Sequence, residues 1–182
     1  MVLKKRLLLL TGMPGVGKTT IVSRAVLDLR RRGLSVGGVC SKESKSGGRR
    51  VGFYMVDLMT DTREALAALT GEGPRLGRYR VNLKGLAEFA ARAITEAIAY
   101  SDVVVVDEVG PMELLSPEFR RAVDSLVESA KPGLLVVHET MKEPLMEKIR
   151  GREDAELVQV TLENRDGLLA EVFTKLLELV PP

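Results

Sequence analysis

The 182-residue sequence predicts an α/β fold of three layers, with a mainly parallel central sheet between helices and one inserted antiparallel β-hairpin. Three observations predict this fold. Apolar runs of strand length alternate with amphipathic helical patterns along most of the chain. The run Val103–Val106 consists of four β-branched residues, which is typical of a parallel strand buried on both faces. Two strand-like segments, Val36–Cys40 and Arg50–Met59, are joined by a polar, glycine-rich connection too short for parallel pairing.

The composition fits a single domain covering residues 1–182, with an apolar fraction of 45% for the core. The 27 basic and 25 acidic residues give a net charge of +2, so no strong nucleic-acid signal is present. The single cysteine, Cys40, suits a reducing compartment, and no apolar run reaches the ~18 residues that span a bilayer. We therefore expect a cytoplasmic protein without a membrane partner, with a monomer favoured. One glutamine and two asparagines beside 29% charged residues favour a thermophilic source.

The first strand is predicted at the apolar run Leu7–Leu10. The segment Gly12–Thr19 follows it and matches the phosphate-loop pattern G-x-x-x-x-G-K-[ST] at every specified position. A helical pattern then extends over Ile21–Arg32, so the loop lies between a strand and a helix, which is the context that this motif requires.

Each residue type of this loop has a chemical role. Gly12, Gly15 and Gly17 allow backbone conformations that bring N–H groups close to a ligand, and the following helix adds its positive end. Lys18 is predicted to reach the β- and γ-phosphates, and the Thr19 hydroxyl to ligate Mg²⁺. A glycine-rich turn that binds nothing is the alternative, which the complete pattern disfavours. The candidate nucleotide-binding residues here are Gly12, Met13, Pro14, Gly15, Val16, Gly17, Lys18 and Thr19.

The middle of the chain is less regular. Three arginines and Gly33 are expected to end the first helix, as cations and a glycine cap do. Residues 61–81 are expected to be irregular, although the pattern of Glu64–Leu69 allows a helical turn, and a basic run, Arg75–Arg80, follows. Residues Leu86–Ile98 give a good amphipathic helix.

The buried strand Val103–Val106 ends in Asp107 and Glu108, at the edge where open α/β sheets bind ligands. A strand ending in Asp is the second nucleotide-site motif. In one large division of phosphate-loop enzymes, the next Glu orients and deprotonates the attacking water. A strand end that merely faces solvent is the alternative. The second candidate stretch is Val103, Val104, Val105, Val106, Asp107, Glu108, Val109 and Gly110; Lys18 and Glu108 are the predicted catalytic residues, and Thr19 and Asp107 the predicted metal ligands.

The remaining elements alternate between helix and strand. Their predicted positions are a helix from Ser116-Pro117, a strand Leu134–Val137, a helix between Pro144 and Gly151, a strand Glu156–Val160, and a terminal helix with the apolar face Leu168–Leu177.

Several single residues have two interpretations. His138 is expected at the end of a strand beside the Asp107 strand, where a structural, hydrogen-bonded histidine is favoured over a γ-phosphate sensor. Cys40 is expected in the core. Asn164 is expected to cap the last helix, and with Arg165 it is also a candidate for base contact. A transition-state arginine accelerates phosphoryl transfer by ~10³–10⁵. The candidates are Arg78, Arg80, Arg120, Arg121 and Arg165.

The segment Asp107–Leu114, with the sequence DEVGPMEL, resembles the signature of the small P-loop nucleoside-triphosphatases first described from thermophiles, relatives of the vertebrate cancer-related nucleoside-triphosphatase. Gly47–Phe53, Gly77–Val81 and Glu163–Arg165 resemble further family stretches in the same order. The resemblance implies the P-loop NTPase three-layer α/β/α fold and Mg²⁺-dependent hydrolysis of ATP, GTP and other nucleoside triphosphates to diphosphate and phosphate. Pro111 stands where many relatives have lysine, so a cation at that position is not carried over.

Three other functions compete with hydrolysis. A nucleoside or nucleotide kinase would use the same loop and transfer the γ-phosphate to a small acceptor. A regulatory GTPase would carry an N/T-K-x-D motif, which the sequence lacks. A nucleotide-switched binding module would use slow hydrolysis as a timer. Phosphate release without an acceptor distinguishes the hydrolase from the kinase.

Overall fold

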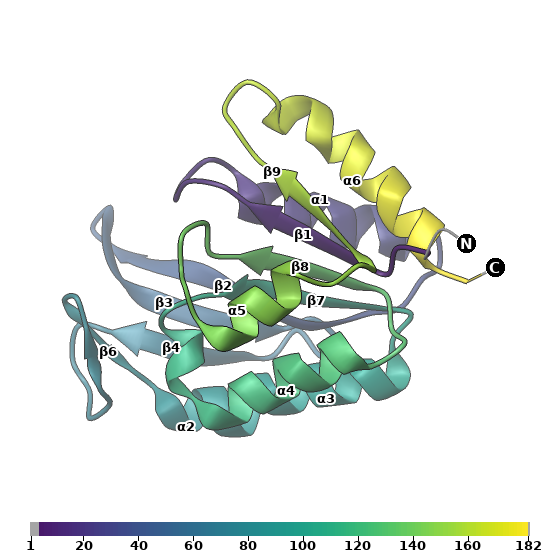
Figure 1. Ribbon diagram of the computed structural model, residues 1–182. Helices are drawn as coiled ribbons and strands as arrows, with labels where there is room; N and C mark the ends of the chain where they lie inside the picture. Colours follow the sequence, from purple (N-terminus) through teal and green to yellow (C-terminus); the bar gives the residue numbers. More distant parts are fainter. Residues whose placement is uncertain (1–3, 182) are drawn as a thin grey trace.

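The computed structural model describes residues 4–181, which form helices around one nine-stranded sheet (Figure 1). The strand order is β5-β6-β4-β3-β2-β7-β8-β1-β9. The strands are β1 (Leu7–Thr11), β2 (Val36–Ser46), β3 (Arg49–Asp57), β4 (Arg63–Ala68), β5 (Arg75–Leu76), β6 (Tyr79–Val81), β7 (Val103–Val109), β8 (Gly133–Val137) and β9 (Ala155–Gln159). The helices are α1 (Lys18–Arg31), α2 (Leu83–Gly85), a π-helical turn η1 (Leu86–Ala90), α3 (Ala91–Tyr100), a 3₁₀ turn η2 (Glu113–Leu115), α4 (Pro117–Glu128), α5 (Pro144–Arg150) and α6 (Arg165–Leu179).

The sheet has a parallel half and an antiparallel half. Strands β2, β7, β8, β1 and β9 pair in parallel, whereas β3, β4, β6 and β5 extend the sheet from β2 by antiparallel pairing. The α/β fold with a mainly parallel core sheet is therefore confirmed. The parallel strands share one carboxyl edge, so the connections after β1 and after β7 lie on the same side of the sheet, separated by β8.

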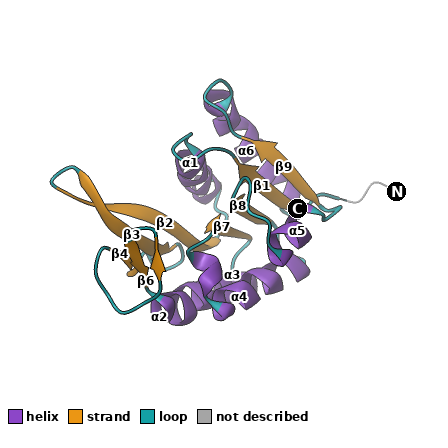
Figure 2. Ribbon diagram, turned by 60° about the vertical axis from the view of Figure 1, so that its left-hand side comes forward, coloured by secondary structure: helices purple, strands orange, loops and turns teal. Residues whose placement is uncertain are grey.

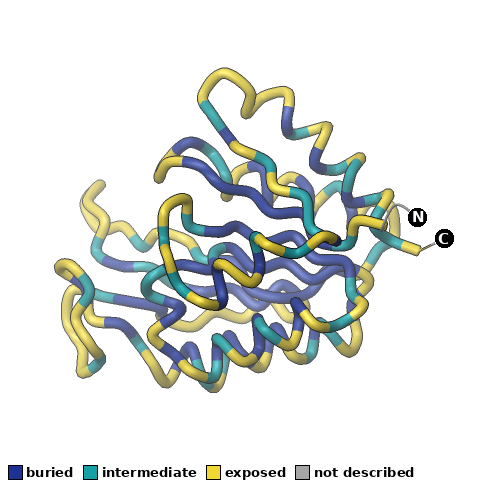
Figure 3. Tube along the Cα trace, in the orientation of Figure 1, coloured by how far each residue is buried: buried dark blue, intermediate teal, exposed yellow. Residues whose placement is uncertain are grey.

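The helices cover both faces of the parallel half (Figure 2). Side chains alternate across the sheet in β1: Leu8 and Leu10 pack in the core with α1 and α6, whereas Leu7 and Leu9 pack with α3, α4 and α5. Figure 3 shows these strands as the buried centre of the molecule. The expected helices are confirmed as α1, η1 with α3, α4, α5 and α6. Within residues 4–181, no helix has the length and apolarity needed to cross a membrane.

The expectation of an irregular segment at 61–81, with a helical turn at 64–69, is wrong. Strand β4 lies there and pairs antiparallel with β3 on one side and β6 on the other. Its residues Leu66 and Ala67 are buried in the core. The local sequence is alanine-rich and favours a helix, but the two neighbouring strands supply hydrogen-bond partners and apolar contacts, so tertiary pairing overrides the local propensity.

The inserted hairpin is confirmed, with a shorter turn than expected. Residues 41–49 were expected to form the connection, but β2 continues to Ser46 and β3 begins at Arg49. The turn is Gly47-Gly48, with φ angles of 55° and 75° that suit a two-residue hairpin turn. Figure 3 shows this end of the hairpin as exposed. An exposed ribbon buries no apolar face, so its strands lack the alternation that reveals a strand in sequence.

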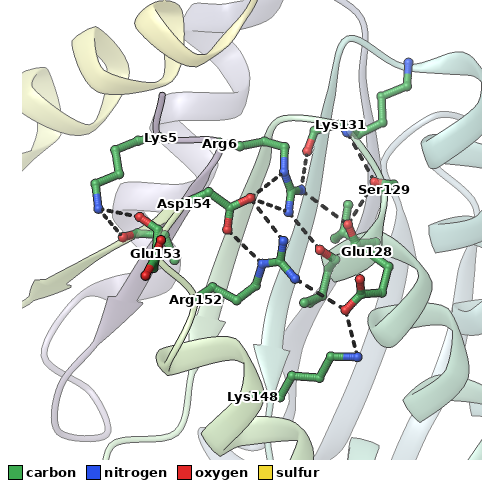
Figure 4. Close-up of polar contacts among 12 residues, drawn as sticks. Lys5, Arg6, Glu128, Ser129, Lys131, Lys148, Arg152, Glu153 and Asp154 are labelled. Carbon is green, nitrogen blue, oxygen red and sulfur yellow. Dashed lines mark hydrogen bonds and ion pairs between the residues drawn. The ribbon is translucent and has the colours of Figure 1, made fainter. Parts of the chain in front are cut away.

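Arg6 joins the start of β1 to two distant elements (Figure 4). Its guanidinium donates hydrogen bonds to the carbonyls of Val127 at 2.8 Å and Lys131 at 2.9 Å, and pairs with Asp154 at 3.0 Å. Both charged side chains are largely buried, at 13% and 12% exposure. Arg6 therefore caps the C-terminal end of α4 and anchors the turn before β9.

We predict that Arg6→Ala lowers the free energy of unfolding by about 2–4 kcal/mol, because Asp154 and the carbonyls lose a buried charged partner. Chemical denaturation measures this loss. The matched control is Arg24→Ala, which removes an exposed pair with Asp28 on α1 and is expected to cost less than ~0.5 kcal/mol. Equal losses in the two variants would contradict the structural role assigned to Arg6.

Candidate functional site

The loop after β1 is shaped by glycines at two critical points. Gly12 has a φ of 146°, and a Cβ there would overlap the carbonyl oxygen of Val160. Gly17 has a φ of 116° and precedes the first residue of α1. Both conformations disfavour other residues, so the predicted loop residues adopt a backbone that only glycine supports at these positions.

The N-terminal end of α1 suits an anion. Gly17 at the N-cap supplies no side-chain hydrogen bond, and the first turn contains no acidic residue, so its N–H groups point toward the loop without a competing carboxylate. Lys18 lies across this loop, with its Nζ 2.6 Å from the Gly12 carbonyl oxygen and 2.9 Å from the Met13 carbonyl oxygen. The loop thus combines the free N–H groups at the start of α1 with the cation of Lys18, and such a combination binds phosphate groups.

A β-bulge places the two carboxylates of β7. The pairing between β7 and β8 shifts between Val106 and Val109, so β7 has one residue more than its partner at Asp107-Glu108. A bulge of this kind turns side chains out of the regular alternation. Asp107 is 3% exposed, whereas Glu108 is partly exposed.

Asp107 lies among the phosphate-loop residues. Its pKa is raised to about 7, mainly by burial and also by Glu108, although the Thr19 hydroxyl and the Lys18 ammonium act in the opposite direction. Its Oδ2 is buried and has no hydrogen-bond partner among residues 4–181. The fold therefore brings Lys18, Thr19, Asp107 and Glu108 into one site, although 88 positions separate Thr19 from Asp107 in the sequence (107 minus 19).

The donor set fits a Mg²⁺ ion that is shared with a substrate. Among the described residues, no group of three or more His, Cys, Asp or Glu side chains forms a metal cage. Mg²⁺ is commonly held by one or two protein oxygens, waters and substrate phosphates instead. The unpartnered Oδ2 of Asp107 beside the Thr19 hydroxyl supplies the acceptor that such an ion and its waters need.

A third carboxylate, Glu113, belongs to the same site and is not among the residues predicted from the sequence. Gly110 separates it from Glu108: a Cβ on Gly110 would lie 2.5 Å from Glu108 Oε1 and 3.1 Å from Glu113 Oε2. Glu113 is 5% exposed, and burial raises its pKa to about 8, with Glu108 as the next cause. The only sequence signal was an acidic residue inside an otherwise apolar turn that follows the carboxylate pair.

This buried carboxyl makes stability depend on pH. Its folded-state pKa lies above the ordinary value of 4.5, so its neutral form stabilises the fold at low pH, and that contribution is lost as the pH rises through about 8. We predict that Glu113→Gln gains stability relative to the wild type between pH 5 and pH 9, on the order of 3 kcal/mol. Chemical denaturation at several pH values measures the difference. A constant difference, like that expected for the exposed control Glu72→Gln, would contradict the prediction.

The structure separates the five candidate arginines. Arg78 donates to the Tyr79 hydroxyl and the Arg50 carbonyl, and Arg80 is directed to the Gly73 carbonyl, all in the antiparallel half. Arg120 pairs with Glu143, and Arg121 pairs with Glu118. Arg165 alone among the five contacts the phosphate loop within the described structure, with Nη1 3.5 Å from the Val16 carbonyl oxygen.

The other single residues have clear positions. His138 directly follows β8, between the Asp107 strand and the phosphate-loop strand, as expected. Its Nδ1 lies 3.4 Å from the Thr140 N–H, which fits a structural role. Cys40 is buried in the core, and burial raises the pKa of its thiol.

The expected side-chain cap by Asn164 is wrong. The residue precedes α6, but its Oδ1 accepts from the Thr161 N–H at 2.8 Å and its Nδ2 donates to the Gln159 carbonyl at 2.8 Å. Asn164 therefore shapes the connection between β9 and α6, because both polar atoms of its side-chain amide bond to the segment that precedes the helix.

The family model and the relatives named below that match this chain are all described as nucleoside-triphosphatases. The family model described as NTPase matches residues 7–173. The chain is 43% identical over 176 residues to the nucleoside-triphosphatase THEP1 of Thermofilum pendens, covering 94% of this chain and 96% of the relative. It is 44% identical over 170 residues to the same enzyme of Methanopyrus kandleri, covering 93% and 94%.

Two solved structures share the fold. The crystal structure of THEP1 from Aquifex aeolicus matches with a TM-score of 0.81 and 28% identity, covering 93% of this chain and 98% of the other. The solution structure of a human cancer-related nucleoside triphosphatase matches with a TM-score of 0.80 and 36% identity, covering 93% and 96%.

Proposed function

The chain belongs to this nucleoside-triphosphatase family, and from that premise we propose that the phosphate loop and the β7 carboxylates form a Mg²⁺-dependent site that hydrolyses several nucleoside triphosphates. The observation that carries the proposal is the meeting of Lys18 and Thr19 with the buried Asp107. A phosphate site alone binds nucleotides, and the adjoining carboxylates add what hydrolysis requires.

The loop binds and orients the phosphates. Its backbone N–H groups, including those at the start of α1, donate hydrogen bonds to the β-phosphate oxygens, and the positive charge of Lys18 lies toward the γ-phosphate. Thr19 and Asp107 would hold Mg²⁺, which when bound neutralises charge on the phosphate oxygens. All of these contacts would be made to the triphosphate group, which every nucleoside triphosphate carries. We therefore propose broad nucleotide specificity.

Glu108 acts on the attacking water. Its carboxylate orients the water and accepts one proton as the oxygen attacks the γ-phosphorus and the bond to the bridging oxygen breaks. The products are nucleoside diphosphate and inorganic phosphate. Gly110 leaves room for this carboxylate, because a side chain there would collide with Glu108 Oε1.

Phosphate release from ATP, GTP, CTP and UTP, each with Mg²⁺ and with excess chelator, tests the proposal. We expect release from all four nucleotides without an acceptor, and its loss on chelation. Release that required a second nucleoside would favour a kinase. Turnover should be slow, on the order of 10⁻⁴ to 10⁻² s⁻¹, unless an arginine reaches the γ-phosphate.

A further inference from the structure

Arg165 lies against the outer side of the phosphate loop. It is the first residue of α6, and its Cδ would be 3.5 Å from a Cβ placed on Gly17. The connection before it is bound to the end of β1, directly before the loop, because the Val160 N–H donates to the Thr11 carbonyl at 2.8 Å. Arg165 is thus held beside the loop.

The positive charge of Arg165 is only weakly neutralised by a neighbouring carboxylate. Its nearest carboxylate is Asp166, with Nε 3.9 Å from an oxygen, and the Asp166 side chain is 92% exposed. The arginine side chain is 44% exposed. By contrast, Arg120 pairs with a Glu143 side chain that is only 13% exposed. A ligand on the loop would therefore meet an available guanidinium at Arg165.

The strand order indicates which end of a bound nucleotide would lie near Arg165. In the order β7-β8-β1-β9, the carboxylates lie near the carboxyl end of β7, the phosphate loop follows β1, and Arg165 follows β9. The phosphate loop therefore lies between the β7 carboxylates and Arg165. If the terminal phosphate is at Glu108, the rest of the nucleotide extends away from β7.

We propose that Arg165 binds the nucleoside end of the nucleotide and has no transition-state role at the γ-phosphate. This inference rests on the proposed function. The planar guanidinium stacks on the aromatic face of a base, a contact that all four bases offer, so it adds affinity without selecting one nucleotide. Such a contact is the same in the ground state and the transition state, so it changes KM and leaves kcat unchanged.

The test compares ligands with and without a nucleoside. Binding of ADP, the non-hydrolysable ATP analogue AMP-PNP and inorganic tripolyphosphate is measured by calorimetry for the wild type, Arg165→Ala and Arg165→Lys. We expect Arg165→Ala to weaken binding of both nucleotides about tenfold and to leave tripolyphosphate affinity within about twofold. Arg165→Lys, which keeps the charge and loses the plane, should resemble the alanine variant. KM for ATP should rise about tenfold while kcat stays within about twofold.

The matched control is Arg121→Ala, which removes an exposed arginine of α4 and should bind all three ligands like the wild type. Equal loss of tripolyphosphate affinity, full recovery by lysine, or a large fall in kcat with unchanged ADP affinity would each overturn the inference. So would unchanged nucleotide binding in Arg165→Ala. If the wild type bound neither ADP nor tripolyphosphate, the proposed function itself would fail.

Discussion

Glu108→Gln should retain nucleotide binding while losing hydrolysis by a factor of about 10² to 10⁴, because the amide cannot accept the proton of the attacking water. The change is nearly isosteric, so the close fit between Gly110 and Glu108 Oε1 is kept. The carboxylate at Asp107 and the loop contacts of Lys18 also remain. The expected defect is therefore confined to kcat.

Two measurements check this expectation. Single-turnover phosphate release gives the chemical step, and calorimetry with AMP-PNP gives the affinity, which should stay within about threefold of the wild type. The control is Glu72→Gln, in the exposed connection after β4, which should behave like the wild type in both. Hydrolysis at the wild-type rate in Glu108→Gln would remove Glu108 from its proposed role.

Lys18→Ala should weaken triphosphate binding about 10- to 100-fold and lower hydrolysis by a further factor of about 10² to 10³. Two losses combine here. The variant removes the positive charge beside the phosphates, and it removes the hydrogen bonds from Nζ to the carbonyls of Gly12 and Met13.

Titration of ADP and AMP-PNP separates the loss of positive charge at the phosphates from the loss of the hydrogen bonds within the loop. We expect the triphosphate analogue to lose more affinity than ADP, because the charge of Lys18 acts mainly on the β- and γ-phosphates. Lys84→Ala, on the exposed surface of α2, is the matched control, since its side chain is 80% exposed. Unchanged affinity in Lys18→Ala would show that the loop is not the nucleotide site.

Much of the parallel half could be predicted because its strands are buried on both faces. A fully buried strand must be apolar at consecutive positions, and Val103–Val106 shows this requirement directly in the sequence. The phosphate loop could be predicted for a similar reason. Its backbone needs glycine at Gly12 and Gly17, so geometry restricts the residue types there.

The antiparallel half was harder to predict. Strand β4 is stabilised by β3 and β6, and neither partner is visible in its own alanine-rich sequence. Glu113 was missed for a related reason. Its burial arises where η2 folds back beside Gly110 and the end of β7, and the sequence shows only one more glutamate.

The sequence by itself determined the α/β fold, the phosphate loop and the Asp107-Glu108 pair, because strands buried on both faces and a glycine-bound loop tolerate few residue types. The tertiary structure alone decided which distant side chains meet. It turned the β7 carboxylates at a bulge, enclosed Glu113 beside them, and separated Arg165 from the four other arginines. These outcomes depend on strand order and packing between distant segments, which local residue patterns do not encode.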